Sequence, residues 1–349
     1  MADLVARPDP AFWAGKRVLV TGHTGFKGAW AARMLARLGA KVTGFALDPL
    51  PGPSAFAALS VAGGLEQDLR RPLADAAALQ RAVAGSDIVL HLAAQAIVSE
   101  GYRDPVGTWA SNVMGTLTLL EALRGSGVMA AVIVTTDKVY RNAGERAFVE
   151  SDLLGGDDPY SASKAACEIL VASHRAAYPD LPPMATARAG NVIGGGDFGR
   201  DRLIPDLVRA WHDGEVLVLR NPASTRPFQH VLDVIAGYLL LAEALARGNA
   251  PPAVNLGPAE AELSVSGMLT HWQEATGNVV IWRLSDAPPM AEKPRLALDS
   301  SLARAALGWA PRKPTALAVA ETASWYYDWG AGADMVAITD AAISSFLEG

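Results

Sequence analysis

Residues 17–28 read RVLVTGHTGFKG, an apolar run followed by three glycines at G-x-x-G-x-x-G spacing. The apolar run is typical of a buried parallel strand, and a helical pattern follows over residues 28–38. In such a unit Gly22 would form the tight turn, Gly25 would let the backbone approach a pyrophosphate, and Gly28 would let the helix pack on the strand. The segment therefore predicts a dinucleotide-binding unit, with a purely structural turn as the alternative.

The same alternation of strand and helix continues outward from this segment. We expect strands at 17–21, 41–46, 87–92, 130–135 and 184–189, and helices at 28–38, 73–83, 106–123 and 161–177. Repeated βαβ units with right-handed crossovers build an open sheet covered by helices on both faces. The predicted fold class is therefore α/β, a Rossmann-type doubly wound parallel sheet.

Beyond Gly190 the composition changes to short elements separated by Gly and Pro. Within this part, 231–246 and 253–257 look like a helix and a strand that return to the sheet. We therefore predict a dinucleotide-binding domain of residues 1–189 together with 229–258. A smaller, interleaved second domain would take 190–228 and 259–349.

Composition narrows the function classes. The chain has 349 residues, of which half are hydrophobic and 19% are charged, with a net charge of −6, as in a globular protein. The absence of a basic run argues against nucleic acid as a partner, and no apolar stretch is long enough for a membrane span. A single cysteine, Cys167, excludes an intrachain disulfide and a Cys-ligated zinc site.

Two further expectations concern location and metals. Residues 1–10 lack the apolar stretch of an export signal, so we expect a cytoplasmic protein. The six histidines lie far apart without the spacing of metal ligands, and no Ser-His-Asp motif surrounds Ser161. We therefore expect no metal site and no catalytic triad.

Two aspartates are candidates for the adenosine half of a dinucleotide. Asp48 follows the second predicted strand by a few residues, about 20 residues after Gly28, where a carboxylate can bind ribose hydroxyls and favour NAD over NADP. Asp68, after a third short strand, could accept a hydrogen bond from the adenine amino group. A strand-end turn at Asp48 and a surface position for Asp68 are the alternatives.

Tyr160 and Lys164 lie four residues apart, on one face of the predicted helix 161–177. A tyrosine with its free pKa of about 10 cannot act as a base at pH 7 unless a cation stabilises the phenolate. Lys164 and a positively charged nicotinamide would supply that cation. The alternative is an amphipathic helix in which both residues are incidental.

Thr136, Asp137 and Lys138 follow the predicted strand 130–135, at the carboxyl edge of the sheet where such folds bind ligands. A hydroxyl, a carboxyl and an amine side by side can polarise a carbonyl, protonate a leaving hydroxyl and accept a carbon-bound proton. The alternative is a solvated Asp–Lys pair in a loop.

These residues together resemble the extended short-chain dehydrogenase/reductase superfamily, and within it the 4,6-dehydratases of nucleotide sugars. The matching stretches span nearly the whole chain: Phe12-Trp13, Gly15-Lys16, the glycine loop with Lys27, Asn112 to Thr116, Thr136-Asp137-Lys138, Tyr160 to Lys164, Arg188 to Asp197, Asp201 to Pro205 and Arg226 to Val231. The Asp137-Lys138 pair points to the CDP-glucose branch, because related dTDP- and GDP-sugar dehydratases usually carry Asp-Glu and the 4-epimerases lack the pair.

The resemblance implies a reaction in which NAD takes a hydride from C4 of the sugar and later returns it to C6. Tyr160, as a phenolate beside Lys164, would remove the proton of the C4 hydroxyl, and Thr136 would donate to the C4 oxygen. Asp137 would protonate the departing C6 hydroxyl. Lys138 is the candidate base for the C5 proton, with a water relay or Tyr160 as competitors.

The resemblance also implies which residues bind the ligands. For NAD these are Gly22, Thr24, Gly25, Phe26, Lys27, Gly28, Asp48, Asp68, Leu69, Leu92, Ala93, Ala94, Gln95, Thr135, Tyr160, Lys164 and Arg188. For the nucleotide sugar they are Asn112, Asn191, Arg202, Leu203, Arg226, His230 and Arg295. Arg202 and Arg226, with Asn191, would hold the diphosphate, because a guanidinium fork matches phosphate oxygens.

Three readings stay open besides the CDP-glucose dehydratase. The chain could be a 4-epimerase, a dehydratase for another nucleotide sugar, or an inactive dinucleotide-binding sensor. Asp137-Lys138 argues against the epimerase, and intact Tyr160 and Lys164 argue against the sensor. In each enzymatic reading the partner is a nucleotide sugar, and we expect a homo-oligomer.

Overall fold

A seven-stranded parallel sheet forms the centre of the computed structural model, which describes residues 5–141, 146–286 and 295–349. Its strand order is β11-β6-β5-β4-β1-β2-β3. The strands are β1 (Arg17–Thr21), β2 (Lys41–Ala46), β3 (Gln67–Arg70), β4 (Ile88–His91), β5 (Ala130–Thr136), β6 (Met184–Ala189) and β11 (Ala253–Leu256). Every neighbouring pair is parallel, which confirms the predicted fold class.

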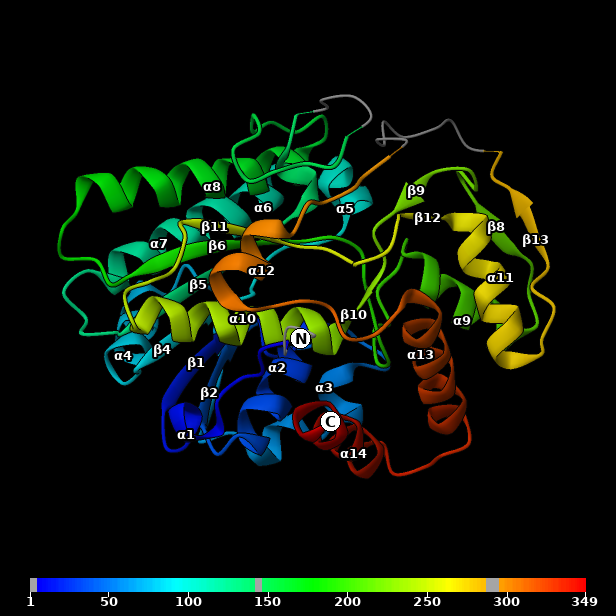
Figure 1. The fold of residues 1–349 in the computed structure, drawn as a ribbon, viewed down its shortest axis with the longest axis horizontal. Coiled ribbons are helices and arrows are strands. Elements are labelled where there is room, and N and C mark those ends of the chain that lie inside the picture. Colours follow the sequence, from blue (N-terminus) through cyan, green and yellow to red (C-terminus); the bar gives the residue numbers. More distant parts are fainter. Residues whose placement is uncertain (1–4, 142–145, 287–294) are drawn as a thin grey trace.

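Helices cover both faces of this sheet (Figure 1). The α-helices are α1 (Pro10–Trp13), α2 (Phe26–Arg37), α3 (Ala55–Ala58), α4 (Ala76–Ala84), α5 (Val98–Arg103), α6 (Pro105–Trp109), α7 (Gly115–Leu123), α8 (Pro159–Ala177), α9 (Leu203–Asp213), α10 (Val231–Ala246), α11 (Val265–Thr276), α12 (Ser301–Leu307), α13 (Thr315–Gly330) and α14 (Met335–Glu348). Shorter turns of helix are η1 (Val61–Gly64), the π-helical η2 (Ala110–Met114) and η3 (Asp137–Val139).

Alternate residues of the buried strands feed two apolar clusters, one on each face of the sheet. In β5, Val132 and Val134 join the cluster made with α2 and α10, whereas Ala131 and Ile133 join the cluster made with α4, α7 and α8. Side chains of a strand alternate between faces, and both faces here are covered by helices. This is why β5 is apolar without interruption until it reaches Thr135.

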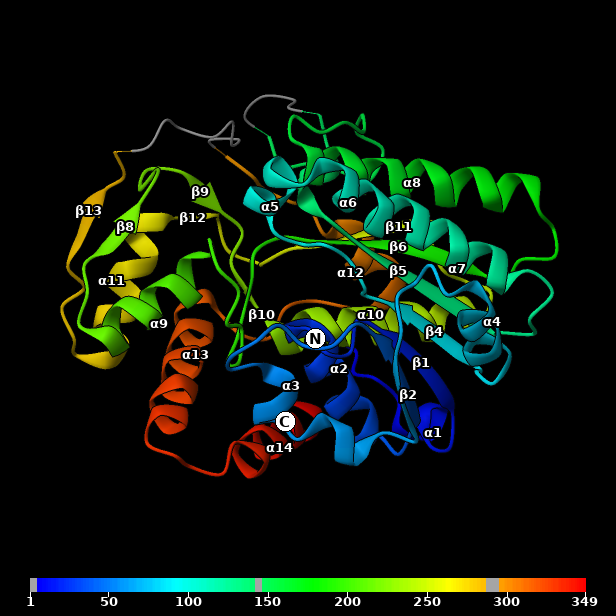
Figure 2. The ribbon, with the colours of Figure 1, turned by 180° about the vertical axis from the view of Figure 1, so that it is seen from behind.

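A smaller lobe stands beside the carboxyl edge of the sheet (Figure 2). It contains α9, α11 and three two-stranded pairs, β7 (Val192–Ile193) with β10 (Gln229–His230), β9 (Thr225–Arg226) with β12 (Leu263–Ser264), and β8 (Leu217–Leu219) with β13 (Trp282–Leu284). Between these segments the chain returns to the sheet through α10 and β11, and β11 pairs with β6. The domain boundaries themselves stay a prediction.

Several predicted element boundaries are wrong for identifiable reasons. The helix predicted over 73–83 begins at Ala76, because Asp75 accepts a hydrogen bond from the amide of Ala78 and caps it. The helix predicted over 161–177 begins at Pro159 behind the cap Asp158. The stretch predicted as one helix over 106–123 is divided into α6, η2 and α7.

No helix of the described residues combines the length and the apolar character that crossing a bilayer would require. Residues 1–4, part of the segment on which the expected location rests, lie outside the described residues. The expected cytoplasmic location stays a prediction.

A buried ion pair joins α8 to β6. Glu168 and Arg188 are each 4% exposed, and two nitrogens of the guanidinium donate to the two carboxylate oxygens at 2.9 and 2.8 Å. The hydroxyls of Thr135 and Thr186 donate to the same carboxylate. Since every oxygen of Glu168 is used, the pair fixes the helix that carries Tyr160 against the central strands.

We expect Glu168→Ala to lower the free energy of unfolding by about 3–5 kcal/mol, because it leaves the Arg188 guanidinium buried without its partner. The midpoint of urea unfolding, followed by circular dichroism, measures the loss. As a control, Asp286→Ala removes an ion pair with Arg283 in which the carboxylate is 94% exposed, so its midpoint should hardly move. A Glu168→Ala midpoint as close to wild type as that of the control would contradict a stabilising role for the buried pair.

Candidate active site

The glycine loop between β1 and α2 is packed as a dinucleotide-binding turn requires. Gly22 has φ +76°, and a Cβ on it would lie 2.6 Å from the backbone nitrogen of Ala93. A Cβ on Gly28 would lie 2.1 Å from the carbonyl oxygen of Gly22, so only glycine allows α2 to come this close to the strand. No described side chain caps α2 at Gly25, which leaves the first amides of the helix to an anion. The loop therefore fits the pyrophosphate of NAD.

A network of charges lies beside this loop, where the adenosine would bind. Asp68 accepts hydrogen bonds from Nε2 of His23 at 2.9 Å and from Arg70 at 2.8 Å. Arg70 also lies 3.4 Å from Asp48, whose side chain is 84% exposed. Because two carboxylates neutralise Arg70, the network does not favour the extra phosphate of NADP, and the exposed Asp48 is open to ribose hydroxyls.

The position of Asp68 corrects one expectation. Asp68 lies within β3, not after it, and Arg70 and His23 together hold its pKa below the usual range of an aspartate. Leu69, the next residue, packs against the cluster on the α4 side, and the hydroxyl of Thr24 donates to the carbonyl of Leu47.

The segment after β4 closes the glycine loop from the other side. It contains Leu92, Ala93, Ala94 and Gln95, and Ala93 approaches Gly22 as described. Asn112, predicted to bind the substrate, is 1% exposed and makes two hydrogen bonds with the backbone of Gln95 and a third with Ser163. The amide of Asn112 braces the Gln95 segment against α8, and its contact with the substrate stays a prediction.

A cleft of about 880 Å³ lies between the sheet edge and the smaller lobe. It brings together predicted residues from six separate parts of the chain: Phe26, Lys27, Thr135, Thr136, Asp137, Lys138, Tyr160, Asn191, Arg202, Leu203 and Arg226. The carboxyl end of β5 and the N-terminal turn of α8 therefore face the same space as the start of α2.

Tyr160 is buried in the wall of this cleft, and burial raises the pKa of its hydroxyl to about 12. A hydrogen bond with Thr136 and the positive charge of Arg202 act in the opposite direction. The Lys164 ammonium donates to the carbonyl of Val134 at 3.0 Å, and burial lowers its pKa. Thus the described cation that lowers the pKa of Tyr160 is Arg202, which the sequence pattern alone did not indicate.

Lys27 is a second buried cation of the cleft. Its ammonium lies 3.4 Å from the hydroxyl of Tyr238 on α10. Burial, with the charges of Lys164 and Arg202, lowers the pKa of Lys27 to about 7, although Asp137 opposes this. The start of α2 therefore places an amine near the same centre as Tyr160, with its neutral form favoured by burial.

Asp137 is 1% exposed, and only one of its two carboxylate oxygens has a hydrogen-bond partner among the described residues. Its Oδ1 accepts from the Thr136 hydroxyl at 2.9 Å and lies 3.9 Å from the Lys138 ammonium. Its Oδ2 is buried and has no hydrogen-bond partner among the residues that the structure describes. A buried carboxylate oxygen without a donor is costly, so this atom fits a ligand that brings a hydroxyl.

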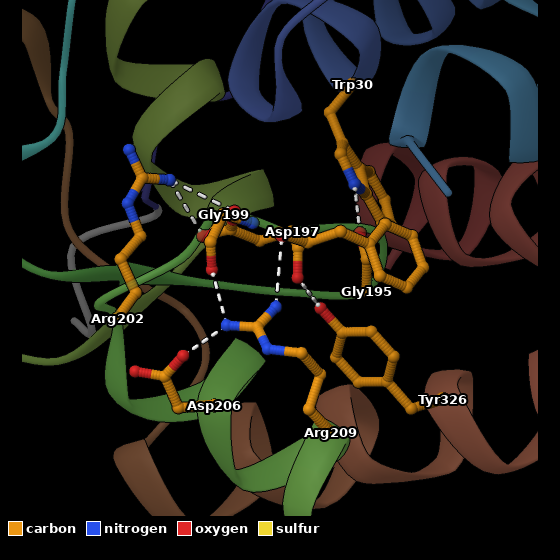
Figure 3. Close-up of polar contacts among 9 residues, drawn as sticks. Trp30, Gly195, Asp197, Gly199, Arg202, Asp206, Arg209 and Tyr326 are labelled. Carbon is orange, nitrogen blue, oxygen red and sulfur yellow. Dashed lines mark hydrogen bonds and ion pairs between the residues drawn. The ribbon is translucent and has the colours of Figure 1, made fainter. Parts of the chain in front are cut away.

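The residues predicted for the diphosphate lie in the smaller lobe and line the cleft. Arg202 is paired with Asp197 at 2.9 Å, as Figure 3 shows. Arg226 is 7% exposed and donates to the carbonyl of Thr225 at 2.8 Å, and Asn191 lies next to β7. Leu203 begins α9 directly after Arg202.

Among the predicted residues outside the lining of the cleft are Arg188, His230 and Arg295. Arg188 spends its guanidinium on Glu168, Tyr140 and the carbonyl of Glu150, so its placement argues against the predicted contact with NAD. His230 is 3% exposed, caps α10 through Nδ1, and has its pKa lowered to about 3 by burial.

Arg295 forms an ion pair with Glu262 beside a different, smaller cavity. His230 and Arg295 therefore lie outside the lining of the cleft, and their contacts with the substrate stay predictions.

Asp197 and Asp201 are cleft residues to which sequence reasoning gave no role. Asp201 accepts a hydrogen bond from Ser99, which joins the first turn of α5 to the smaller lobe. Asp197 follows three glycines and precedes Arg202 by five residues, so an acid–arginine pair near the turn was the available signal.

Comparison with known proteins agrees with this geometry. Residues 18–257 match the family described as the NAD dependent epimerase/dehydratase family. The CDP-glucose 4,6-dehydratase of Salmonella typhimurium is 37% identical over 97% of this chain and 98% of its own length. The dTDP-glucose 4,6-dehydratase of Streptomyces griseus is 32% identical over 89% of this chain and 94% of its own.

Among solved structures, a double mutant of the dTDP-glucose 4,6-dehydratase of Streptomyces venezuelae with NAD bound superposes with a TM-score of 0.81. It is 26% identical and covers 92% of this chain and 99% of its own. The predicted superfamily and the predicted cofactor, NAD, are confirmed. This chain belongs to the NAD dependent epimerase/dehydratase family.

Proposed function

We propose that this protein is a nucleotide-sugar 4,6-dehydratase that converts CDP-glucose to CDP-4-keto-6-deoxyglucose. The observation that carries the proposal is the meeting of Thr136, Asp137 and Tyr160 in one cleft beside the glycine loop. The 37% identity to a CDP-glucose 4,6-dehydratase, over nearly the full length of both chains, supports the substrate. A 4-epimerase has no step that needs an acid such as Asp137.

The residues that would hold NAD are the glycines of the β1–α2 turn, with Asp48 and Asp68 toward the adenosine. Bound there, NAD would supply reversible hydride transfer, which the proposed reaction needs at C4 and again at C6 of the sugar. The chain itself must then move four protons: one from the C4 hydroxyl, one from C5, one to the departing C6 hydroxyl, and one back to C5 when the hydride reaches C6.

Tyr160 takes the proton from the C4 hydroxyl. With a pKa near 12 its hydroxyl is a poor base at neutral pH, so the phenolate needs added positive charge. Arg202 supplies part of it, Lys164 lies one helical turn away, and the cofactor ring adds more when it binds. Thr136 donates to the C4 oxygen as charge develops there.

Asp137 protonates the C6 hydroxyl as it leaves, through the buried oxygen that has no partner among the described residues. The Lys138 ammonium lies 3.9 Å from Oδ1 of Asp137, so Lys138 is engaged with the proposed acid. We therefore propose that Lys138 orients Asp137, and that Tyr160 or a water molecule is the base toward C5.

The nucleotide would lie over the smaller lobe, with its diphosphate held by Arg202, Arg226 and Asn191. Arginine suits this role because its planar fork matches phosphate oxygens. The expected homo-oligomer stays a prediction.

We expect the purified protein to carry bound NAD and to convert CDP-glucose without added cofactor, since the hydride is borrowed and returned within one cycle. The 4-keto product absorbs in alkali, and this absorbance should rise with CDP-glucose and stay low with dTDP-, GDP- and UDP-glucose. Continuous release of NADH, or preference for another nucleotide, would refute the proposed reaction or substrate.

Two substitutions should separate the oxidation from the elimination. Tyr160→Phe leaves no group to take the C4 proton, so NADH absorbance should never appear in a single turnover. Asp137→Asn keeps the oxidation but lacks the acid for C6, so bound NADH should accumulate while product formation falls about 10²–10⁴-fold. Tyr327→Phe, at a half-exposed tyrosine on α13, is the matched control and should retain wild-type rates. Full dehydration by Asp137→Asn would remove this residue from the mechanism.

Asp48→Ala should weaken NAD binding by about tenfold while leaving kcat near the wild-type value at saturating NAD, because Asp48 would contact only the ribose. Titration of the NAD-stripped protein, followed by tryptophan fluorescence, gives the affinity. An unchanged affinity would exclude Asp48 from the cofactor site.

A further inference from the structure

The guanidinium of Arg202 is held from one side. Its Nη1 donates to both carboxylate oxygens of Asp197, at 3.0 and 2.9 Å, and Asp197 is the only described residue that pairs with it (Figure 3). The Arg202 side chain is 34% exposed and lines the cleft. A Cβ on Gly199 would lie 3.3 Å from Nη1 of Arg202, so the small residue there leaves room for this pose.

Asp197 is itself fixed by a frame of hydrogen bonds to the loop that carries it. Its Oδ1 accepts from the amide of Gly199 at 3.0 Å, and its carbonyl accepts from the hydroxyl of Tyr326 on α13 at 2.5 Å. Arg209 on α9 donates to the carbonyls of Phe198 and Gly199, both at 3.1 Å. Two helices therefore hold the backbone of the loop that carries Asp197, and the Gly199 amide holds its carboxylate.

The frame also reaches the cofactor side of the molecule. The indole nitrogen of Trp30 donates to the carbonyl of Gly195 at 2.9 Å, and Trp30 lies on α2, one turn beyond the glycine loop (Figure 3). Helix α2, whose first turn would face the pyrophosphate of NAD, therefore also holds the position of the loop that carries Asp197.

We propose that Asp197 is a positioning residue for the diphosphate of the substrate: it holds Arg202 by one nitrogen so that the remaining N–H groups face the cleft. The proposal rests on the proposed function for the identity of the nucleotide sugar, but its physical content is the binding of a nucleoside diphosphate.

Two effects of Asp197 on an anion oppose each other. Its negative charge repels a diphosphate, so removal of the charge alone would tighten binding. Its hydrogen bonds keep Arg202 ordered before the ligand arrives. Without them, the entropy cost of ordering this long side chain is subtracted from the binding free energy. The proposal states that ordering dominates, and this predicts a definite sign.

The test compares CDP binding, by isothermal titration calorimetry, to wild-type holoenzyme and to Asp197→Ala, Asp197→Asn, Arg202→Ala and the double variant Asp197→Ala/Arg202→Ala. We expect Asp197→Ala to weaken CDP about tenfold. Asp197→Asn should stay within about threefold of wild type, because its amide oxygen still accepts from Arg202 and Gly199. In the Arg202→Ala background the alanine should add no further loss.

Two outcomes would overturn the proposal. Tighter binding by both Asp197 variants would mean that only the charge acts. An equal loss from Asp197→Ala with and without Arg202 would mean that the residue supports the fold of the loop and does not act through the arginine.

A matched control is Asp152→Ala. Asp152 also accepts from a backbone amide, that of Val149, and pairs with an arginine, Arg146, but it does not line the cleft. It should leave CDP affinity unchanged. If Asp197→Ala does not fold, Tyr326→Phe removes only the hydroxyl that holds the Asp197 carbonyl and should weaken CDP severalfold, and an unchanged affinity would again overturn the proposal.

The same measurement separates this proposal from the proposed function. Wild type that binds CDP through Asp197 and Arg202 but fails to convert CDP-glucose would refute the reaction and keep the positioning role. If CDP does not bind, dTDP, UDP and GDP are titrated in turn. Absence of binding to all four would overturn the positioning role.

Discussion

The contact between Gly28 and the carbonyl of Gly22 is the constraint on which the site depends. It sets where α2 starts, and a Cβ at position 28 would fall 2.1 Å from that oxygen. From this start, the first turn of α2 opens toward an anion, Lys27 enters the cleft, and Trp30 reaches the loop before Asp197. The close approach of Gly28 to Gly22 therefore fixes both the cofactor-binding turn and the position of the loop that carries Asp197.

Burial and charge are balanced against each other in the cleft. Tyr160 and Lys27 both have their neutral forms favoured by burial, while Arg202 favours the phenolate of Tyr160. Asp137 keeps a buried oxygen without a partner among the described residues. Such a centre is costly for the protein alone, and a ligand that brings hydroxyls and phosphates relieves the cost. The buried polar groups that cost the protein free energy are therefore the same groups that would bind the ligand.

Sequence patterns predicted the βαβ framework closely, since Arg17–Thr21, Lys41–Ala46 and Met184–Ala189 are strands with the expected bounds. They predicted less well what polar residues do. Asn112 and Arg188 stand in motifs that resemble a ligand site. In the structure, however, Asn112 forms hydrogen bonds with the Gln95 backbone and Arg188 forms an ion pair with Glu168. A motif indicates that a polar residue is needed at a position. It does not say whether the residue holds the protein together or contacts a ligand, because both roles use the same chemical groups.

The sequence by itself determined the fold class, the glycine turn, and the grouping of Thr136, Asp137, Tyr160 and Lys164 near one sheet edge, because parallel strands end together and strand and helix periods are local properties. Only the tertiary structure decided the pairing of Asp197 with Arg202, the approach of Arg202 to Tyr160 and the withdrawal of His230 into the core. These outcomes depend on how the smaller lobe packs against α2 and α13. Packing between segments far apart in the chain has no period in the sequence from which it can be deduced.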